Sequence, residues 1–214
     1  GGTNTPLGTT AGGTTIANIG ALDLNGFTLG TTEAITSLNG LGFGPGSSVV
    51  NGNSNRGALM NTSNTPVSYS GAITLAAASR INADYGAITL SGAFSGAFGL
   101  TFGGFSNGTI SGVVGIGTGT IVKDGIGVLT LSNSNTYTGT TTVSVGTLKL
   151  GATGGVTNTP LGTTGAGTIV SLGARLDLNG FTLGTAEGLT LNGVGYGLGD
   201  FASGALINSS GSSV

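Results

Sequence analysis

The sequence predicts an all-β protein wound as a parallel β-helix, a form of β-solenoid. Three observations predict this fold: a long repeat returns at a fixed offset, apolar residues alternate with polar ones in short runs, and glycine or Asn-Gly pairs separate those runs. Fixed-period repeats are typical of solenoids, and alternation with a period of two is typical of strands. No segment has the i, i+3, i+4, i+7 spacing of an amphipathic helix.

The long repeat returns at one offset in residue number. The segment T-N-T-P-L-G-T-T begins at residues 3 and 157 (157 − 3 = 154), and L-D-L-N-G-F-T-L-G begins at residues 22 and 176 (176 − 22 = 154). A third pair, G-A-L-M-N-T-S at residue 57 and G-A-L-I-N-S-S at residue 204, has a smaller offset (204 − 57 = 147), so the second copy lacks seven residues (154 − 147 = 7). We predict that residues 1–154 form one full repeat and residues 155–214 the first part of a second copy, in one continuous solenoid.

Alternation within the repeat assigns side chains to the inside or the outside of the coil. Leucine or valine pairs flank Asp23, Thr130, Ser144 and Lys149 in turn, which places the polar residue on the wet face of each strand. Uncharged Thr and Asn stacked about 4.8 Å apart on successive coils avoid like-charge repulsion. The predicted inward residues are Leu24, Leu29, Leu131, Val143, Val145, Leu148, Leu150, Leu178 and Leu183, and the predicted outward residues are Asp23, Thr28, Lys149 and Asp177.

The Asn-Gly pairs leave one alternative open. An Asn-Gly pair between two alternating runs, as at Asn25-Gly26, is also a strong signal for a two-residue hairpin turn. An array of hairpins or an antiparallel sandwich would therefore use the same local pattern. In a parallel β-helix the pair is instead a tight corner between two faces of one coil. The density of short strands and the scarcity of charges favour the β-helix.

Composition excludes several classes of protein. The 214 residues include 46 glycines, 37% apolar residues and only 6% charged residues, whereas disordered chains combine low hydrophobicity with high net charge. The five basic residues are scattered, so no nucleic-acid partner is expected. With no cysteine, disulfides and thiol chemistry are excluded, and no apolar run is long enough for a transmembrane helix.

The stretch 123–151, K-D-G-I-G-V-L-T-L-S-N-S-N-T-Y-T-G-T-T-T-V-S-V-G-T-L-K-L-G, closely resembles the passenger-associated transport repeat of bacterial autotransporters. The family pattern is K-x-G-x-G-x-L-T-L-S-G-x-N-T-Y-T-G-x-T-x-V-x-x-G-T-L, from which this chain departs at Asn133, where glycine is usual. The resemblance implies a right-handed parallel β-helix exported by type V secretion. It also implies display on a bacterial cell surface, as a slice of a larger passenger anchored in the outer membrane through a part outside this chain.

No catalytic, cofactor-binding or metal-binding residue is predicted. Histidine is absent, and the repeat pairs Asp23 with Asp177 and Glu33 with Glu187, as expected of repeat features rather than of one site. A two-carboxylate glycosidase or calcium at the aspartates is conceivable, but nothing marks a carboxylate pair and the G-G-x-G-x-D calcium nonapeptide is missing. Lys123 and Asp124 are interpreted as a solvated corner, and the tyrosines and phenylalanines mainly as core or corner packing rather than as a binding surface. The carboxylates are Asp23, Glu33, Asp84, Asp124, Asp177, Glu187 and Asp200.

Two functions of different classes follow from the sequence. The first is a structural repeat of an extracellular surface or filament protein, a stiff stalk or fibre. Its partner would be the protein itself, through further repeats of one chain or through copies stacked end to end. The second is an adhesin whose side binds host surfaces, other cells or glycans. Faithful repetition of the T-N-T-P-L-G-T-T segment favours the fibre, because an adhesin is expected to carry divergent loops.

Overall fold

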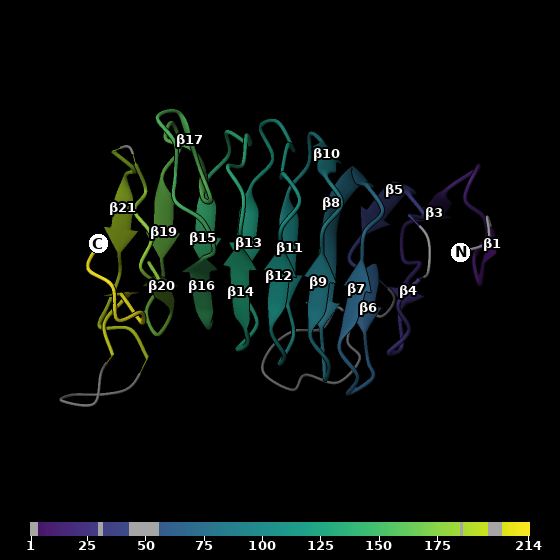
Figure 1. The fold of residues 1–214 in the computed structure, drawn as a ribbon, viewed down its shortest axis with the longest axis horizontal. Helices are drawn as coiled ribbons and strands as arrows, with labels where there is room; N and C mark the ends of the chain where they lie inside the picture. The colour runs from purple at the N-terminus through teal and green to yellow at the C-terminus, as the bar shows by residue number, and fades with distance from the viewer. Residues whose placement is uncertain (1–3, 30–31, 43–55, 185, 197–202) are drawn as a thin grey trace.

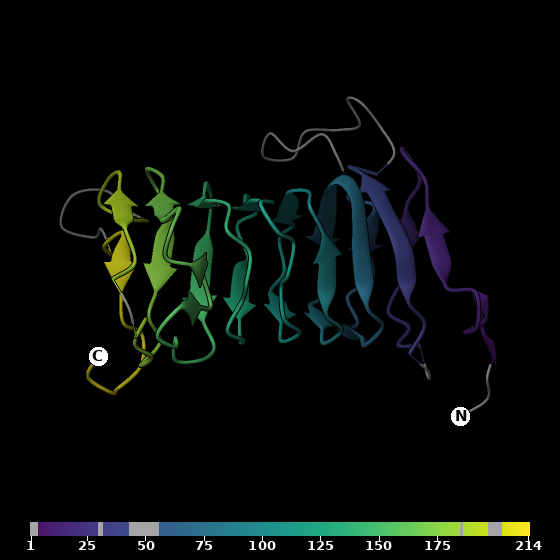
Figure 2. The same ribbon diagram turned by 90° about the horizontal axis from the view of Figure 1, so that it is seen from above.

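The chain winds into a single stack of coils. The computed structural model describes residues 4–29, 32–42, 56–184, 186–196 and 203–214. In those residues no helix occurs, strands lie side by side along the long axis, and the two ends of the chain lie at opposite ends of the stack (Figure 1). The view from above shows the same order, from purple at the N-terminal end to yellow at the C-terminal end (Figure 2). The predicted parallel β-helix is confirmed.

Strands on successive coils pair in parallel and form three faces, called A, B and C in chain order. Face A runs through Thr14, Ile35, Ile73, Phe94 and Val114. Its strands are β3 (Thr14–Ile16), the start of β5 (Ile35–Gly40), the start of β8 (Ile73–Ala83) and β10 (Phe94–Gly96).

Face B and face C carry the longest ladders. Face B contains β4 (Leu22–Asp23), β6 (Leu59–Asn61), the end of β8, β11 (Leu100–Gly103), β13 (Ile121–Lys123), β15 (Thr141–Val143), β19 (Thr168–Val170) and β21 (Leu189–Leu191). Face C contains β7 (Val67–Tyr69), β9 (Ile88–Leu90), β12 (Gly108–Ile110), β14 (Val128–Leu131), β16 (Thr147–Leu150), β20 (Arg175–Asp177) and β22 (Leu206–Ile207).

Antiparallel pairing among the described strands is confined to two short local hairpins. They join β1 (Asn4–Thr5) to β2 (Gly8–Thr9) and β17 (Asn158–Thr159) to β18 (Gly162–Thr163). Both hairpins lie in the repeated T-N-T-P-L-G-T-T segment, so the repeat reproduces the same local structure at both places.

The length of a coil follows from residues that pair directly. Phe94 lies over Ile73 and Ile121 lies over Leu100, so the residue number advances equally over these coils (94 − 73 = 21 and 121 − 100 = 21). Longer excursions occur from Leu148 to Leu176 (176 − 148 = 28) and from Leu22 to Leu59 (59 − 22 = 37). The excursion before Leu176 contains the hairpin of residues 158–163, and the parallel stacking of strands continues after both excursions.

The core is a column of aliphatic side chains from the three faces. Of the residues predicted to point inward, Leu24, Leu131, Val143, Leu148 and Leu150 are buried, and Leu29, Leu178 and Leu183 are partly buried against the core. Thr28 is exposed, and Asp23 and Lys149 are half-buried, as a wet strand face requires. The alternation therefore assigns most of the core correctly.

Three placements predicted from the sequence are wrong. Val145 is 41% exposed because the chain turns after Val143, where the amides of Ser144 and Val145 both donate to the carbonyl of Lys123. Asp177 is only 3% exposed because Ser209, on the next coil, covers its carboxylate. Lys123 is not a solvated corner residue, since it is 1% exposed and points into the core.

The Asn-Gly pairs at residues 25–26 and 179–180 are corners and not hairpins. Asn25 and Gly26 have positive φ angles of 46° and 79°, and the amide of Phe27 donates to the carbonyl of Leu24 at 2.8 Å. The strand β4 that leads into this corner pairs in parallel with β6 on the next coil. The hairpin alternative is excluded at this corner, because the chain continues to face C and does not fold back.

Candidate functional site

The first candidate site is a buried cation at the start of the transport-repeat motif. Lys123 ends β13 and lies in the inner ladder of face B, between Phe102 and Val143. Its Nζ donates to the carbonyl of Gly125 and, at 3.4 Å, to that of Val145. Burial lowers the pKa of Lys123 from its ordinary value of 10.5 to about 8; Asp124 opposes this shift and Arg80 adds to it.

This lowered pKa makes stability depend on pH. Between pH 8 and 10 the unfolded chain binds more protons at Lys123 than the folded chain, so the free energy of unfolding should rise by about 2–3 kcal/mol across that range. Burial raises the pKa of Tyr69 and Tyr137, so the unfolded chain loses these hydroxyl protons at a lower pH than the folded chain does. The free energy of unfolding should therefore fall as pH rises above 10. Denaturant unfolding measured at half-unit pH steps checks both the rise and the fall.

Two substitutions identify the side chain that causes the rise between pH 8 and 10. Lys123→Met should abolish the rise between pH 8 and 10, because it removes the buried titrating group. Lys149→Met, at a half-buried position on face C, should leave the rise unchanged. A rise that persists in Lys123→Met would show that another group causes it.

An ion pair beside Lys123 joins two coils that are not adjacent. The guanidinium of Arg80 on β8 holds the Asp124 carboxylate in two-point contact, with Nη1–Oδ2 at 2.6 Å and Nη2–Oδ1 at 2.9 Å. Gly103 lies on the coil between them, where a Cβ atom would be 1.9 Å from Arg80 Nη2. Glycine at this position therefore leaves the space through which the arginine reaches, and the pair fastens three coils together.

The N-T-Y-T-G part of the motif supplies buried polar contacts within one coil and between coils. Asn135 accepts from the amide of Val114 at 2.8 Å and donates to the carbonyl of Pro160 at 2.7 Å. The Tyr137 hydroxyl is bonded to Thr141 Oγ1 at 2.7 Å. Both side chains are buried, so these hydrogen bonds satisfy polar groups inside the stack at corners between strands.

Asp23 and Asp177 form the same hydrogen-bonded corner in the two copies of the repeat. Asp177 accepts from the amides of Asn179 and Ser209 at 2.9 and 3.0 Å, and from the Ser209 hydroxyl at 2.6 Å. Asp23 accepts the corresponding bonds from Asn25 and Thr62. Desolvation alone would raise the pKa of Asp177, but the bonds from Ser209 and Asn179 and the charge of Lys149 outweigh it and lower that pKa.

These corners should contribute independently to stability. Asp23→Ala and Asp177→Ala should each lower the free energy of unfolding by about 1–3 kcal/mol, because each leaves amides without partners. The double variant should show the sum, because the sites share no partner. The pKa of Asp177 is lower in the folded chain than in the unfolded chain, so its carboxylate stabilises the fold only while it is ionised. The loss caused by Asp177→Ala should therefore shrink as pH falls through that pKa. Chemical denaturation at pH 7 and pH 3 checks both statements.

The glutamates of the repeat also recur as a pair of equivalent contacts. Thr14 donates to Glu33 at 3.0 Å, and Thr168 donates to Glu187 at 3.1 Å. The burial of Glu187 raises its pKa. One of its oxygens, Oε2, is buried without a hydrogen-bond partner among the described residues. The two glutamates lie on different coils of the stack and do not form one site.

One edge of the stack carries exposed apolar side chains on consecutive coils. The residues lie between face B and face C, one to a coil, and are called here the apolar edge: Tyr85, Phe105, Ile126, Val145 and Leu172. The rings of Tyr85 and Phe105 stack at 6.4 Å with an interplanar angle of 15°. Of the tyrosines, Tyr69 and Tyr137 are core residues and Tyr85 packs at a corner against Phe105, whereas Tyr196 is largely exposed.

A signal for the apolar edge is present in the sequence. The residue numbers of its first four members increase by nearly equal steps (105 − 85 = 20, 126 − 105 = 21, 145 − 126 = 19), and each member lies beside or near a glycine. That step is the length of one coil, so equal spacing at corner positions indicates one line along the rod. The strand pattern alone gives no direction for a side chain that follows a turn.

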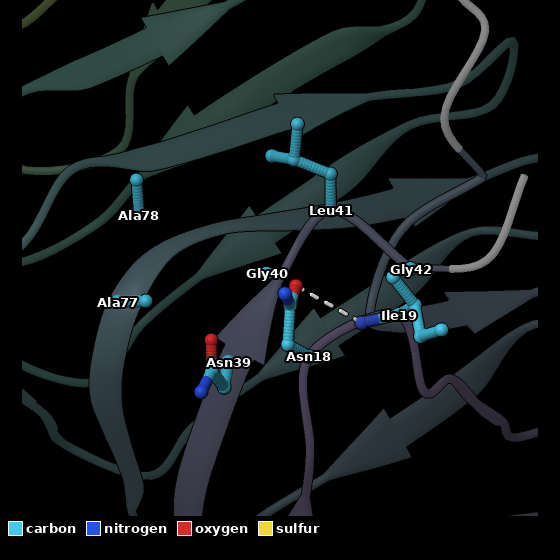
Figure 3. Close-up of a pocket in the computed structure, with 8 residues that line it drawn as sticks. All are labelled: Asn18, Ile19, Asn39, Gly40, Leu41, Gly42, Ala77 and Ala78. Atoms are coloured by element: carbon cyan, nitrogen blue, oxygen red, sulfur yellow. Dashed lines mark hydrogen bonds between the residues drawn. The ribbon is translucent and has the colours of Figure 1, made fainter. Parts of the chain in front are cut away.

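A shallow hollow of about 480 Å³ lies near the N-terminal end of the stack (Figure 3). Asn18 and Asn39 face it from neighbouring coils, Leu41 borders it, and Ala77 and Ala78 lie on the β8 side. The Asn18 side chain accepts from the amide of Ile19 at 3.0 Å. The described residues that line it offer side-chain amides and apolar groups and include no titratable side chain, so the hollow supplies hydrogen bonds without acid–base chemistry.

The carboxylates do not gather into a cation site in the described part of the chain. There, no three His, Cys, Asp or Glu side chains are close enough to hold a metal ion. Asp200, one of the seven carboxylates, lies outside the described residues. Among the residues that the structure describes, no helix has the length and apolar character needed to cross a membrane.

Comparisons with known proteins agree with the motif. The family model of the passenger-associated transport repeat matches residues 121–150, the segment that holds Lys123, Asn135 and Tyr137. The adhesin BmaC autotransporter of Brucella suis biovar 1 (strain 1330) is 44% identical over 73 residues, which is 34% of this chain and 2% of that protein. No solved structure gives a significant match. The chain is therefore a parallel β-solenoid that carries an autotransporter passenger repeat.

Proposed function

We propose that the chain is a non-enzymatic structural repeat of an extracellular bacterial surface protein, forming part of a stiff stalk or fibre. The observation that carries the proposal is the continuity of the strand ladders: those of face B and face C pass from the first copy of the repeat into the second without a break. Continuous strand pairing resists bending, because every coil is hydrogen-bonded to the next along the rod.

The polar groups support a structural role. Asp23, Asp124, Asp177 and the two glutamates of the repeat are engaged with backbone amides, hydroxyls or Arg80. Contacts of this kind join coils to one another, as a structural role requires. Extracellular display, with attachment to the outer membrane elsewhere in a longer protein, rests on the likeness to the autotransporter adhesin and on the transport-repeat motif.

The partner in this function is further solenoid. Successive repeats would be joined within one longer chain, which the faithful repetition favours, or copies would stack end to end through open strand edges. The low net charge of −2 keeps repulsion between copies weak.

Solution scattering from chains of increasing length tests the structural function. Chains with one, two and four repeats should share one cross-sectional radius, while their length should grow by about 30 Å per repeat at about 4.8 Å per coil. A cross-section that grows with the number of repeats would overturn the stalk, because it would mean that repeats fold back on one another.

Adhesion is the second candidate, favoured by the apolar edge and by the adhesin to which part of the chain is similar. Exposed aromatic and aliphatic side chains in a continuous line are a common feature of contact surfaces. Serine at Tyr85, Phe105 and Ile126 should reduce binding to host cells or glycan arrays if the side of the rod is adhesive. Serine at the exposed Thr28, Thr118 and Thr138 is the matched control. Equal binding by both variants would rule out the apolar edge as the adhesive surface.

A further inference from the structure

Equivalent residues of the two repeat copies lie on different faces of the stack. Thr14 pairs with Ile35, in the ladder of face A that continues through Ile73. Thr168 is the equivalent of Thr14 in the second copy (168 − 14 = 154) and pairs with Thr141 in the ladder of face B. These ladders are distinct, because face A meets β8 at Ile73 whereas face B meets it at Ser79.

A second pair of equivalent residues shows the same displacement. Leu22 lies on face B, where it pairs with Leu59 and, through it, with Ile81. Leu176, its equivalent, lies on face C, where it pairs with Leu148. Both pairs therefore move forward by one face from the first copy to the second.

The number of coils in one repeat follows from the same pairings. Starting at Thr14, face A is met again at Ile35, Ile73, Phe94, Val114, Thr136 and Thr159, which is six turns. From Thr159 the chain advances to Thr168 on face B. One repeat thus makes six turns and one face, and with three faces to a turn this is six and one-third turns.

We propose that in an array of these repeats each successive repeat is rotated by one face about the rod axis, so that equivalent surfaces follow a three-step screw. The proposal rests on the proposed function, since it requires repeats that continue one solenoid. Three repeats make 19 turns (3 × 6⅓), which returns the same surface to the same side after about 90 Å at about 4.8 Å per turn.

The edge that receives the next repeat is defined by the first copy. There, β6 (Leu59–Asn61) is covered by Ile81–Ala83 of β8. In the second copy the equivalent strand is β22 (Leu206–Ile207), which pairs with β20 and with no other described strand. A segment with the sequence of Ile81–Ala83 fits this edge, because the identical register is already formed one repeat earlier.

The screw determines on which sides of the rod an array presents the apolar edge. The apolar edge recurs on a different edge of the rod with each repeat, so the array presents it in three directions. A flat surface lying along one side meets equivalent apolar edges only once in three repeats, about 90 Å apart. A partner that binds two adjacent repeats must reach around the rod.

Labelled arrays test the screw. The test chain consists of residues 1–208 followed by two further copies of residues 62–208. It contains Thr28, Thr182 and two added equivalents of Thr182, and both native threonines are exposed. Because the chain has no cysteine, Thr→Cys at these four positions gives four unique sites for gold labels. Electron tomography should show the first and fourth labels on one side, about 90 Å apart, with the second and third on the other two sides.

Two outcomes would overturn the screw, and they are distinguishable. A straight rod with all four labels on one side, spaced by about 30 Å at about 4.8 Å per turn, would overturn the rotation and leave the structural function intact. An array that forms no rod would overturn the structural function and the screw together. Singly labelled arrays identify each label along the rod, and circular dichroism of every array establishes that it is folded.

Discussion

Replacing Leu148 by aspartate should lower the free energy of unfolding by about 3–5 kcal/mol, the largest effect expected of a side-chain substitution in this rod. Leu148 is fully buried and pairs with Leu129 on one side and Leu176 on the other. Aspartate there would place a carboxylate among aliphatic side chains, where it loses its hydration. Denaturant unfolding at pH 7, with unchanged slope, measures the loss.

The matched control for Leu148→Asp is Val145→Asp. Val145 lies three residues earlier in the same strand–turn–strand segment but is largely outside the core. The same new charge should therefore cost about 0.5 kcal/mol or less at that position. Equal losses in the two variants would mean that the inward direction of Leu148 and the outward direction of Val145 are wrong.

Replacing Gly92 by alanine should cost about 3 kcal/mol or more, although alanine is otherwise a mild substitution. Gly92 has an ordinary φ angle, yet a Cβ atom there would lie 1.9 Å from the carbonyl oxygen of Gly71 on the coil before. Gly112, on the coil after, stands in the same relation to Gly92. Successive coils therefore approach so closely at this corner that a methyl group must force them apart.

Two control substitutions separate close approach from backbone strain. At Gly173 a Cβ atom would touch nothing, but φ is +81°, so alanine there should cost about 1 kcal/mol from conformation alone. At Gly12 a Cβ atom would also touch nothing and φ is not positive, so alanine should be nearly neutral. A loss at Gly92 no larger than the loss at Gly173 would contradict the close packing of coils.

The glycine content illustrates what sequence can and cannot predict. The sequence leads one to expect glycine where the backbone has a positive φ angle. This is the reason for glycine at corners such as Gly26. The close approach at Gly71, Gly92 and Gly112 could not be predicted, because it depends on which residues of different coils lie over one another. Their regular steps in residue number (92 − 71 = 21, 112 − 92 = 20) are visible in the sequence, but they gain meaning only once the coil length is known.

The ends of strands limit prediction in the same way. Local alternation correctly places Val143 and Leu148 inside, because both lie within strands. It fails at Val145 and Asp177, where a turn or a residue from the next coil decides the burial. The charge of Lys123 suggests a solvated residue, yet its position in the ladder between Phe102 and Val143 takes it into the core, where backbone carbonyls accept its hydrogen bonds.

Diffraction from aligned arrays of the repeat tests the parallel solenoid most directly. In the structure the strands of the faces lie across the rod and are hydrogen-bonded to the coils beside them, so the spacing between strands lies along the rod axis. The expected pattern therefore has a sharp reflection at about 4.8 Å on the meridian, parallel to the rod. A reflection of that spacing confined to the equator, as from strands that run along the rod in hairpins, would contradict the parallel stacking of coils.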